Sequence, residues 1–195
     1  MPVNNELYPI FAKLGELELL LVGGGNVALE KLNSLLSNSP AARITIVAPL
    51  FKDAVIELVT EHPSVKIIQR PFDESDLNNK QLAILATDDK ELHRHIKQLA
   101  VSKGILVNVA DTPELCDFYL SSIVQKGNLK IAISTNGKSP TIAKRIKEVL
   151  NDTIPNEIDD LLGNMESIRN KMSTDFAEKV KRLNELTKSL TENSD

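Results

Sequence analysis

A glycine-rich turn near the start of the chain has the residue types and spacing needed to bind a phosphate group. The apolar run Leu19–Val22 leads directly into Gly23-Gly24-Gly25-Asn26-Val27-Ala28, which matches the pattern Gly-x-Gly-x-x-Ala. In this pattern Gly23 allows a tight strand-to-helix turn, Gly25 lets the backbone approach a pyrophosphate, and Ala28 lets the helix pack closely on the strand. The free N–H groups at the helix start would hold the anion. The sequence therefore predicts a dinucleotide site here, and the alternative is a glycine turn that binds nothing.

The residue that usually selects between nucleotides is missing. A carboxylate about 20 residues beyond the glycines commonly binds the ribose 2′-hydroxyl. Here that region is an apolar run, Arg43–Val47, followed by Ala48-Pro49-Leu50 without an acidic residue. The sequence by itself therefore does not decide between NAD and NADP.

Length and composition limit the class of protein. The 195 residues allow one ordinary core and a smaller appended unit, and 42% hydrophobic with 26% charged residues is typical of a globular chain. The apolar runs are too short to cross a bilayer and the first residues do not resemble a signal peptide, so we expect a cytoplasmic protein without a membrane partner. A net charge of −4 argues against a nucleic-acid partner.

Cysteine and histidine give no sign of a stored metal. Cys116 is the single cysteine, which excludes an internal disulfide and a multi-cysteine metal site, so we expect a packed thiol. His93 and His95 lie two residues apart on a predicted helix and point in different directions, so we expect surface residues and no metal ligands.

The elements that must position the glycine turn alternate between strand and helix. Short apolar runs separated by helix-compatible segments predict an α/β fold with a Rossmann-type, doubly wound parallel sheet. The predicted strands are Leu17–Val22, Arg43–Val47, Val65–Gln69, Leu82–Ala86 and Ile105–Val109. Apolar spacing predicts the buried helix positions Val27, Leu32, Leu35 and Leu36, and later Leu92, Ile96 and Leu99.

The pattern changes after Thr112. Strands predicted at 118–124 and 129–134 flank the turn Gln125–Asn128 and form a hairpin outside the parallel sheet. A basic helix follows at 141–151, with Ser139 as N-cap and Pro140 in the first helical position. From Pro155 onward the spacing is that of a small helical bundle. We therefore predict a nucleotide-binding domain at 1–112, a hairpin with a basic helix at 113–150 and a helical C-terminal domain at 151–195.

Polar residues follow two of the predicted strands. Thr87 and Asp88 come after the fourth strand, and Asp111 comes after the fifth, so all three face the crevice at the carboxyl edge of the sheet. A desolvated Asp111 there would have a raised pKa and could accept a proton. The alternative is that Asp111 only caps the Asp-Thr-Pro turn.

Four motifs in this order resemble one known family. They are Val22–Ala28, Ala86–Asp89, Asn108–Asp111 and Ser134–Pro140. The chain from about Leu7 to Leu150 is similar to the precorrin-2 dehydrogenase family of siroheme biosynthesis, which includes the N-terminal half of bacterial siroheme synthase.

The resemblance implies a function and a set of site residues. It implies NAD-dependent oxidation of the tetrapyrrole precorrin-2 to sirohydrochlorin by a homodimer joined through the hairpin. It assigns Asp111 as the catalytic residue. The implied cofactor-binding residues are Gly23, Gly24, Gly25, Asn26, Val27, Pro49, Leu50, Thr87 and Asp88. The substrate-binding residues are Asn108, Ser122, Lys138 and Ser139, of which Lys138 and the Ser139 helix start would face substrate carboxylates.

Two other functions are compatible with these residues. Some relatives insert iron or cobalt into sirohydrochlorin, so a chelatase is one alternative, with the activity present in addition or alone. The other is a regulatory domain that senses NAD and has no enzymatic activity, which would leave the Asn136–Pro140 motif and the hairpin without a role.

Overall fold

The chain divides into two compact units. The computed structural model describes residues 4–172 and 175–188. The first unit contains residues 4–121 with 136–138, and the second contains 122–135 and 139–188. The three segments expected from the sequence, with boundaries at 112 and 150, stay a prediction.

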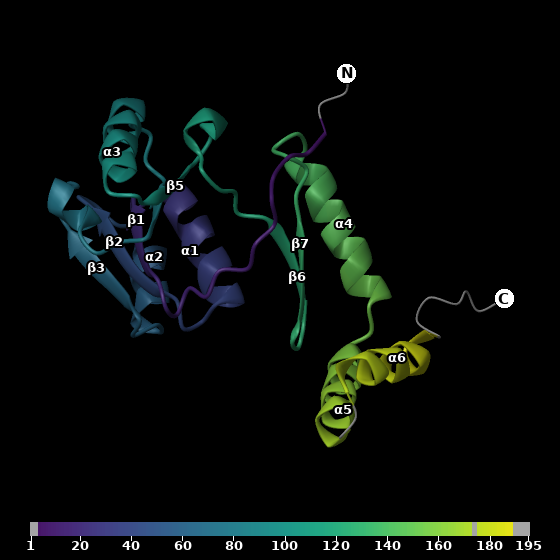
Figure 1. The fold of residues 1–195 in the computed structure, drawn as a ribbon. Helices are drawn as coiled ribbons and strands as arrows, with labels where there is room; N and C mark the ends of the chain where they lie inside the picture. The colour runs from purple at the N-terminus through teal and green to yellow at the C-terminus, as the bar shows by residue number, and fades with distance from the viewer. Residues whose placement is uncertain (1–3, 173–174, 189–195) are drawn as a thin grey trace. The chain divides into compact units, whose positions relative to one another are not determined.

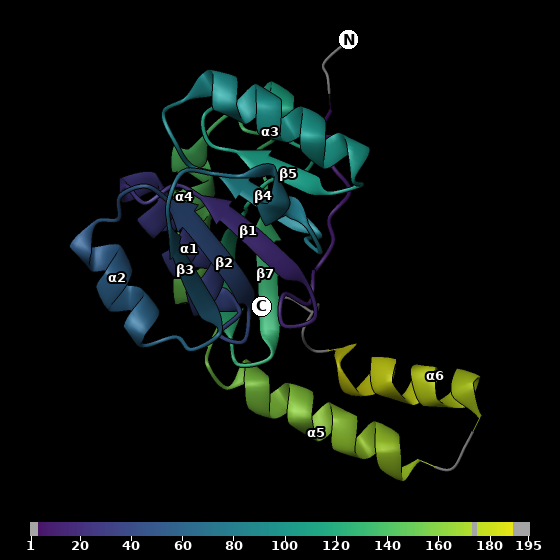
Figure 2. The ribbon, with the colours of Figure 1, turned by 90° about the vertical axis from the view of Figure 1, so that its left-hand side faces the viewer.

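The first unit is built on a parallel sheet of five strands in the order β3-β2-β1-β4-β5 (Figure 2). Every neighbouring pair in this sheet is parallel, which confirms the predicted doubly wound α/β class. Each strand begins and ends within one residue of its predicted bounds. The strands are β1 Glu18–Val22, β2 Arg43–Ala48, β3 Val65–Gln69, β4 Leu82–Leu85 and β5 Leu106–Val109.

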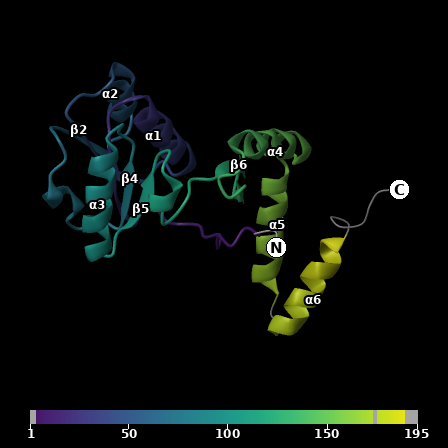
Figure 3. The same cartoon turned by 90° about the horizontal axis from the view of Figure 1, so that it is seen from above.

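Helices cover both faces of the sheet, with α1 and α2 on one face and α3 on the other (Figure 3). Their bounds are α1 Asn26–Asn38, α2 Asp53–Thr60 and α3 Lys90–Ser102. Alternate residues of β1 point to opposite faces, so Leu19 and Leu21 pack with α1 while Leu20 and Val22 pack with α3. The central strands are therefore apolar on both sides, as a sheet covered on both faces requires.

The buried face of α3 differs from the prediction. Ile96 is buried as expected, but Leu92 and Leu99 are only half-buried, and His93 and Ala100 are buried instead. Residues 93, 96 and 100 form one stripe at helical spacing, so the helix is rotated slightly from the orientation that its apolar residues alone predict. On α1 the predicted Leu32, Leu35 and Leu36 are buried, whereas Val27 is only half-buried and Ala28 is buried beside it.

A charged pair closes the loop after β3. Arg70 donates to both carboxylate oxygens of Asp76 at 2.8 and 2.6 Å, and the Asp73 N–H donates to the same carboxylate at 2.9 Å. Asp76 lies in the short 3₁₀ helix Glu74–Leu77 and is 8% exposed. Burial opposes its ionisation, but the Arg70 and Asp73 hydrogen bonds outweigh burial and lower the pKa of Asp76.

The described residues of the second unit form a hairpin and three helices (Figure 1). Strand β6, Ser122–Lys126, pairs antiparallel with β7, Leu129–Ile133, and α4, Pro140–Thr153, packs against the hairpin. The prediction of a strand from residue 118 is wrong, because Phe118 and Leu120 pack against the core of the first unit instead. The predicted hairpin itself is confirmed, with a tighter turn at Gly127 and Asn128.

The C-terminal helices do not form the predicted bundle core. They are α5, Ile158–Lys171, and α6, Phe176–Leu186, and neither has a buried residue among those described. Phe176 is 82% exposed. The spacing was correct for helices, but the partner surface for their apolar faces is absent from the described part of this single chain.

Candidate functional site

The glycine turn lies at the point where the sheet reverses direction. Strand β1 has β2 on one side and β4 on the other, so the crossovers that leave β1 and β4 run in opposite directions at the carboxyl edge. This reversal creates the crevice in which open α/β sheets bind ligands. Gly23 has φ +131°, and a Cβ there would overlap the carbonyl oxygen of Ala86. A Cβ on Gly24 would overlap the carbonyl oxygen of Leu50, whereas Gly25 faces open space with no atom within 4 Å of an added Cβ.

The start of α1 is suited to an anion. Gly25 is the N-cap, no side chain accepts a hydrogen bond from the first turn, and that turn holds no acidic residue. Among the α-helices of residues 4–172 and 175–188, α1 alone lacks both a side-chain cap and a first-turn acid. Its first N–H groups and the positive end of its dipole are thus available to a phosphate. The site geometry fits a dinucleotide pyrophosphate.

The loop after β2 forms one wall of this turn and adds a residue that we did not predict. Pro49 and Leu50 follow the strand as expected, and Leu50 is 77% exposed. Lys52 comes next to them: its N–H donates to the Gly24 oxygen at 2.9 Å and its Nζ donates to Asn26 Oδ1 at 2.6 Å. In the sequence, Lys52 is the first cationic residue after β2, and this position could have indicated that it lies at the site.

The loop after β4 forms the other wall. The Thr87 hydroxyl lies 2.9 Å from His93 Nε2 and accepts a hydrogen bond from the Asp89 N–H at 3.3 Å. Asp88 is exposed beside it, and Asp89 caps α3 by accepting from the Leu92 N–H at 2.9 Å. The predicted Thr87 and Asp88 are thus at the crevice, next to the glycine turn.

His93 does not lie on the surface, so that expectation is wrong. Its side chain is buried under Thr87, and the residue is only 2% exposed. Burial lowers the pKa of His93, and the nearby carboxylates of Asp89 and Asp88 only partly oppose this effect. Burial therefore favours the neutral form of the ring, and Nδ1 has no hydrogen-bond partner in the described protein.

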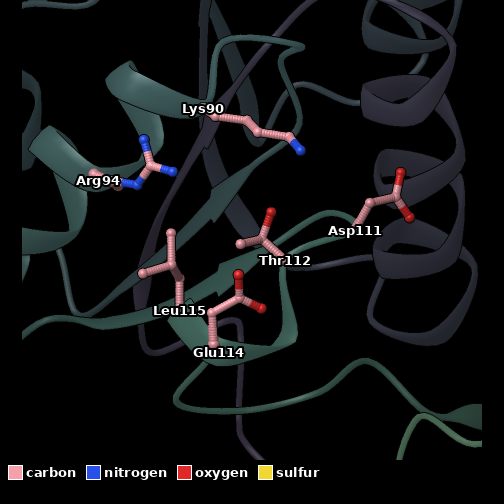
Figure 4. A pocket seen from close by; sticks show the side chains of 6 residues that line it. All are labelled: Lys90, Arg94, Asp111, Thr112, Glu114 and Leu115. Atoms are coloured by element: carbon pink, nitrogen blue, oxygen red, sulfur yellow. The ribbon is translucent and has the colours of Figure 1, made fainter.

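Asp111 lies in a small pocket beyond β5 (Figure 4). The pocket has a volume of about 140 Å³ and is lined by Lys90 and Arg94 from α3 and by Asp111, Thr112, Glu114 and Leu115. Asp111 has φ +54°, a left-handed conformation that costs a non-glycine residue about 1–2 kcal/mol.

The Asp111 carboxylate is not a turn cap. It accepts no hydrogen bond from the described residues, and the following 3₁₀ helix Pro113–Leu115 has no side-chain cap. Asp111 is exposed in this single chain, so the expected desolvation is not provided by the residues described. A strained, exposed and unpaired carboxylate is free to meet a ligand at the carboxyl edge.

Asn108 and Cys116 are held by the protein itself. Asn108 is 6% exposed and its side-chain amide donates to the Phe118 carbonyl oxygen at 2.8 Å. The Cys116 sulfur accepts from the Val109 N–H at 3.2 Å, and burial raises the pKa of its thiol, so Cys116 is a packed thiol. Asn108 thus supports the segment that presents Asp111, and its predicted contact with substrate stays a prediction.

The remaining predicted substrate residues lie after the parallel sheet. Ser122 begins β6 and is half-buried, and Lys138 is exposed. The Ser139 hydroxyl oxygen accepts from the Ile142 N–H at 3.2 Å with Pro140 in the first helical position, which confirms the predicted cap of α4.

Neither a metal cluster nor a membrane-spanning helix occurs in the described part of the chain. No group of three or more His, Cys, Asp or Glu side chains in residues 4–172 and 175–188 is placed to hold a metal ion. None of the helices described is both long and apolar enough to cross a membrane.

Comparisons with known proteins give the same assignment along the chain. Residues 10–122 match the family model described as "Putative NAD(P)-binding", and residues 126–152 match the model "Sirohaem biosynthesis protein central". Siroheme synthase of Pseudoalteromonas translucida is 40% identical over 168 residues, which is 86% of this chain and 35% of that protein. Siroheme synthase of Pseudoalteromonas atlantica is 38% identical over 184 residues, which is 94% of this chain and 37% of that protein.

The chain thus spans about a third of the length of these curated relatives. A solved structure named "SirC, precorrin-2 dehydrogenase" superposes with a TM-score of 0.74 and 26% identity, covering 92% of this chain and 89% of that one. The first family model alone covers more than half of the chain, including the glycine turn and the Asp111 loop. The chain therefore belongs to the family described as "Putative NAD(P)-binding".

Proposed function

We propose that the protein oxidises precorrin-2 to sirohydrochlorin with NAD as hydride acceptor. The observation that carries this proposal is the open anion site at Gly25 and α1, on the same sheet edge as the unpaired Asp111 carboxylate. The likeness of the fold to a protein named as a precorrin-2 dehydrogenase supports the choice of substrate. The match of residues 10–122 to the NAD(P)-binding family supports the choice of cofactor.

The chain's own residues would divide the work between binding and proton transfer. The turn Gly23–Gly25 and the α1 N-terminus would bind the pyrophosphate, with Asn26 and Val27 close to it and Pro49 and Leu50 beside the adenosine. Thr87 and Asp88 would border the nicotinamide half. The bound nicotinamide supplies the hydride acceptor.

Asp111 would remove the second hydrogen. Oxidation of a carbon–carbon single bond to a double bond releases a hydride and a proton, and the hydride leaves with the cofactor. The Asp111 carboxylate would accept the proton and pass it to water. The absence of a protein donor on its oxygens in the described chain supports this role.

Cationic and helix-start groups would hold the substrate carboxylates. Lys138 is exposed, and the α4 N-terminus at Ser139 presents N–H groups and the positive end of its dipole. Asn108 and Ser122 complete the predicted substrate contacts.

We further propose that the protein is a homodimer joined through its second unit. Among that unit's described residues only Val124 and Ala143 are buried apolar side chains, which is too small a core for an independent fold. One face of α4 carries Ile142, Ile146 and Val149 at 55%, 40% and 62% exposure. A second copy of the hairpin and α4 would cover such a stripe, and analytical ultracentrifugation should detect a dimer. A monomer at micromolar concentration would contradict this part.

The cytoplasm is the compartment that we propose. The proposed reaction depends on the cell's nicotinamide nucleotide pool.

The dehydrogenase is tested by mixing protein, precorrin-2 and NAD without air or metal. We expect one NADH to form for each sirohydrochlorin, and absorbance spectra measure the formation of both products. NAD binding without turnover would favour the regulatory alternative, and metal insertion without NAD would identify a chelatase.

The role of Asp111 is tested with Asp111→Asn, which keeps the shape of the side chain and removes its basicity. We expect turnover to fall by about 100-fold or more while the Kd for NAD stays within about twofold. Glu61→Gln, at the end of α2 away from the carboxyl edge, is the matched control and should retain full activity. Near-normal turnover in Asp111→Asn would contradict the proton-transfer role.

A further inference from the structure

We propose that Lys52 recognises a phosphate on the adenosine 2′-position, so that this chain binds NADP as well as NAD. The inference rests on the proposed nucleotide site and deepens it, because it names the residue that sets nucleotide choice. It concerns the loop after β2, where such folds distinguish a ribose 2′-hydroxyl from a 2′-phosphate.

The residue that would exclude NADP is absent from the end of β2. A carboxylate at the end of the second strand binds the 2′-hydroxyl and repels a 2′-phosphate. Here β2 ends at Ala48 and continues Pro49-Leu50-Phe51, so no acidic side chain occupies that position. Nothing at the strand end therefore selects against the additional phosphate.

The backbone of Lys52 is held in a fixed position. Phe51 packs against the core between the sheet and α1, which anchors the loop. The Lys52 N–H donates to the Gly24 oxygen at 2.9 Å, and its own carbonyl oxygen accepts from the Val55 N–H at 2.9 Å as α2 begins. The Lys52 backbone is thus tied both to the glycine turn and to α2.

The Lys52 side chain points to the start of α1 and has no acidic partner among the described residues. Nζ donates to Asn26 Oδ1 at 2.6 Å, which brings the charge to the start of α1. Among the described residues no carboxylate lies within 4.0 Å of Nζ, in contrast to Lys80 and Lys97, which pair with Glu18 and Asp117. An ammonium group has three donors, so two remain after the Asn26 bond.

Together, these three features make Lys52 a suitable cationic partner for a doubly negative ligand group. An exposed lysine with no acidic partner among the described residues, held between the loop after β2 and the start of α1, would stabilise a 2′-phosphate and would contribute little to a neutral 2′-hydroxyl. Lys52 would therefore act on nucleotide choice without taking part in hydride or proton transfer.

The test measures nucleotide binding directly, by titration calorimetry of the full chain with NADP and with NAD. We expect the two Kd values to lie within about tenfold of each other, because a charge-assisted hydrogen bond replaces the usual repulsion. In Lys52→Ala the Kd for NADP should rise about tenfold while that for NAD changes by less than about twofold. Lys52→Glu should lose NADP more strongly and keep NAD, and Lys52→Arg should keep both.

Lys66→Ala is the matched control, since Lys66 is exposed near the amino end of β3, away from the carboxyl edge. It should leave both Kd values unchanged. Equal weakening of NAD and NADP in Lys52→Ala would mean that Lys52 holds the pyrophosphate and would overturn the proposal. Wild-type protein that binds NAD but not NADP would also overturn it. Binding of neither nucleotide would instead overturn the proposed nucleotide site.

Discussion

Gly25→Ala separates the binding role of the glycine turn from its structural role. Gly25 has an extended backbone, φ −93° and ψ −161°, which alanine adopts without strain, and the new Cβ would meet no protein atom within 4 Å. The methyl group would instead occupy the space at the α1 N-terminus that we assign to the pyrophosphate. The substitution should therefore leave the fold intact and weaken nucleotide binding.

Gly25→Ala should change stability little and nucleotide binding strongly. Reduced freedom of the unfolded chain favours alanine by about 0.4–1 kcal/mol, and the poorer N-cap costs about as much, so stability should change by less than about 1 kcal/mol. Loss of one or two charge-assisted hydrogen bonds costs about 2–4 kcal/mol, which corresponds to a rise of about 30- to 700-fold in the Kd for NAD.

Titration calorimetry and urea denaturation of the same preparation measure both quantities. Gly163→Ala in α5 is the matched control, because an added Cβ there also meets nothing within 4 Å. It should leave NAD binding unchanged. A folded Gly25→Ala protein that binds NAD with the wild-type Kd would refute the placement of the pyrophosphate at this turn.

Three further substitutions test features of the fold. Asp76→Asn should lower the free energy of unfolding by about 2 kcal/mol at pH 7. Because the pKa of Asp76 is lowered from 3.8, the difference should shrink as the pH falls below that value. A difference at pH 3 as large as that at pH 7 would contradict this cause. Because the pKa of His93 is lowered in the folded protein, the unfolded chain binds a proton at this residue first as the pH falls, so wild-type stability should decrease below about pH 6.5. His93→Gln should lose this part of the pH dependence, measured by urea denaturation at pH 7.5 and 5.5. An equal change in the free energy of unfolding between the two pH values in both proteins would rule out this role of His93. Gly127→Ala should accelerate hydrogen exchange at the backbone amide of Asn128. Gly127 has φ +56°, and an added Cβ would overlap the Asp159 carboxylate, which accepts a hydrogen bond from that amide at 2.7 Å. Unchanged exchange would show that the turn tolerates a side chain.

Local patterns predicted the parallel sheet closely. The strand Leu82–Leu85, for example, is a short run of apolar residues that are all buried, and such a run between helix-compatible segments is typical of a central strand in a parallel sheet. The same holds for the glycine turn and for the Ser139-Pro140 cap, because backbone geometry and hydrogen bonding at those points depend on a few neighbouring residues.

Interactions between distant segments were not predictable in this way. His93 reads as a polar helix residue, yet tertiary packing buries it beneath Thr87. Phe118 and Leu120 belong to a segment with a strand-like sequence, but they pack against the core of the first unit instead. In both cases burial against remote residues outweighed local preference.

The sequence alone determined the fold class, the glycine turn and the family, because these depend on periodicity and on short motifs whose residues are adjacent in the chain. Only the tertiary structure decided which groups surround the turn. It brought Lys52 to Asn26, placed His93 behind Thr87 and left the Asp111 carboxylate unpaired in the described chain. These outcomes depend on the packing of loops from β2, β4 and β5 at one edge, and the chain spacing of those residues carries no information about such distances.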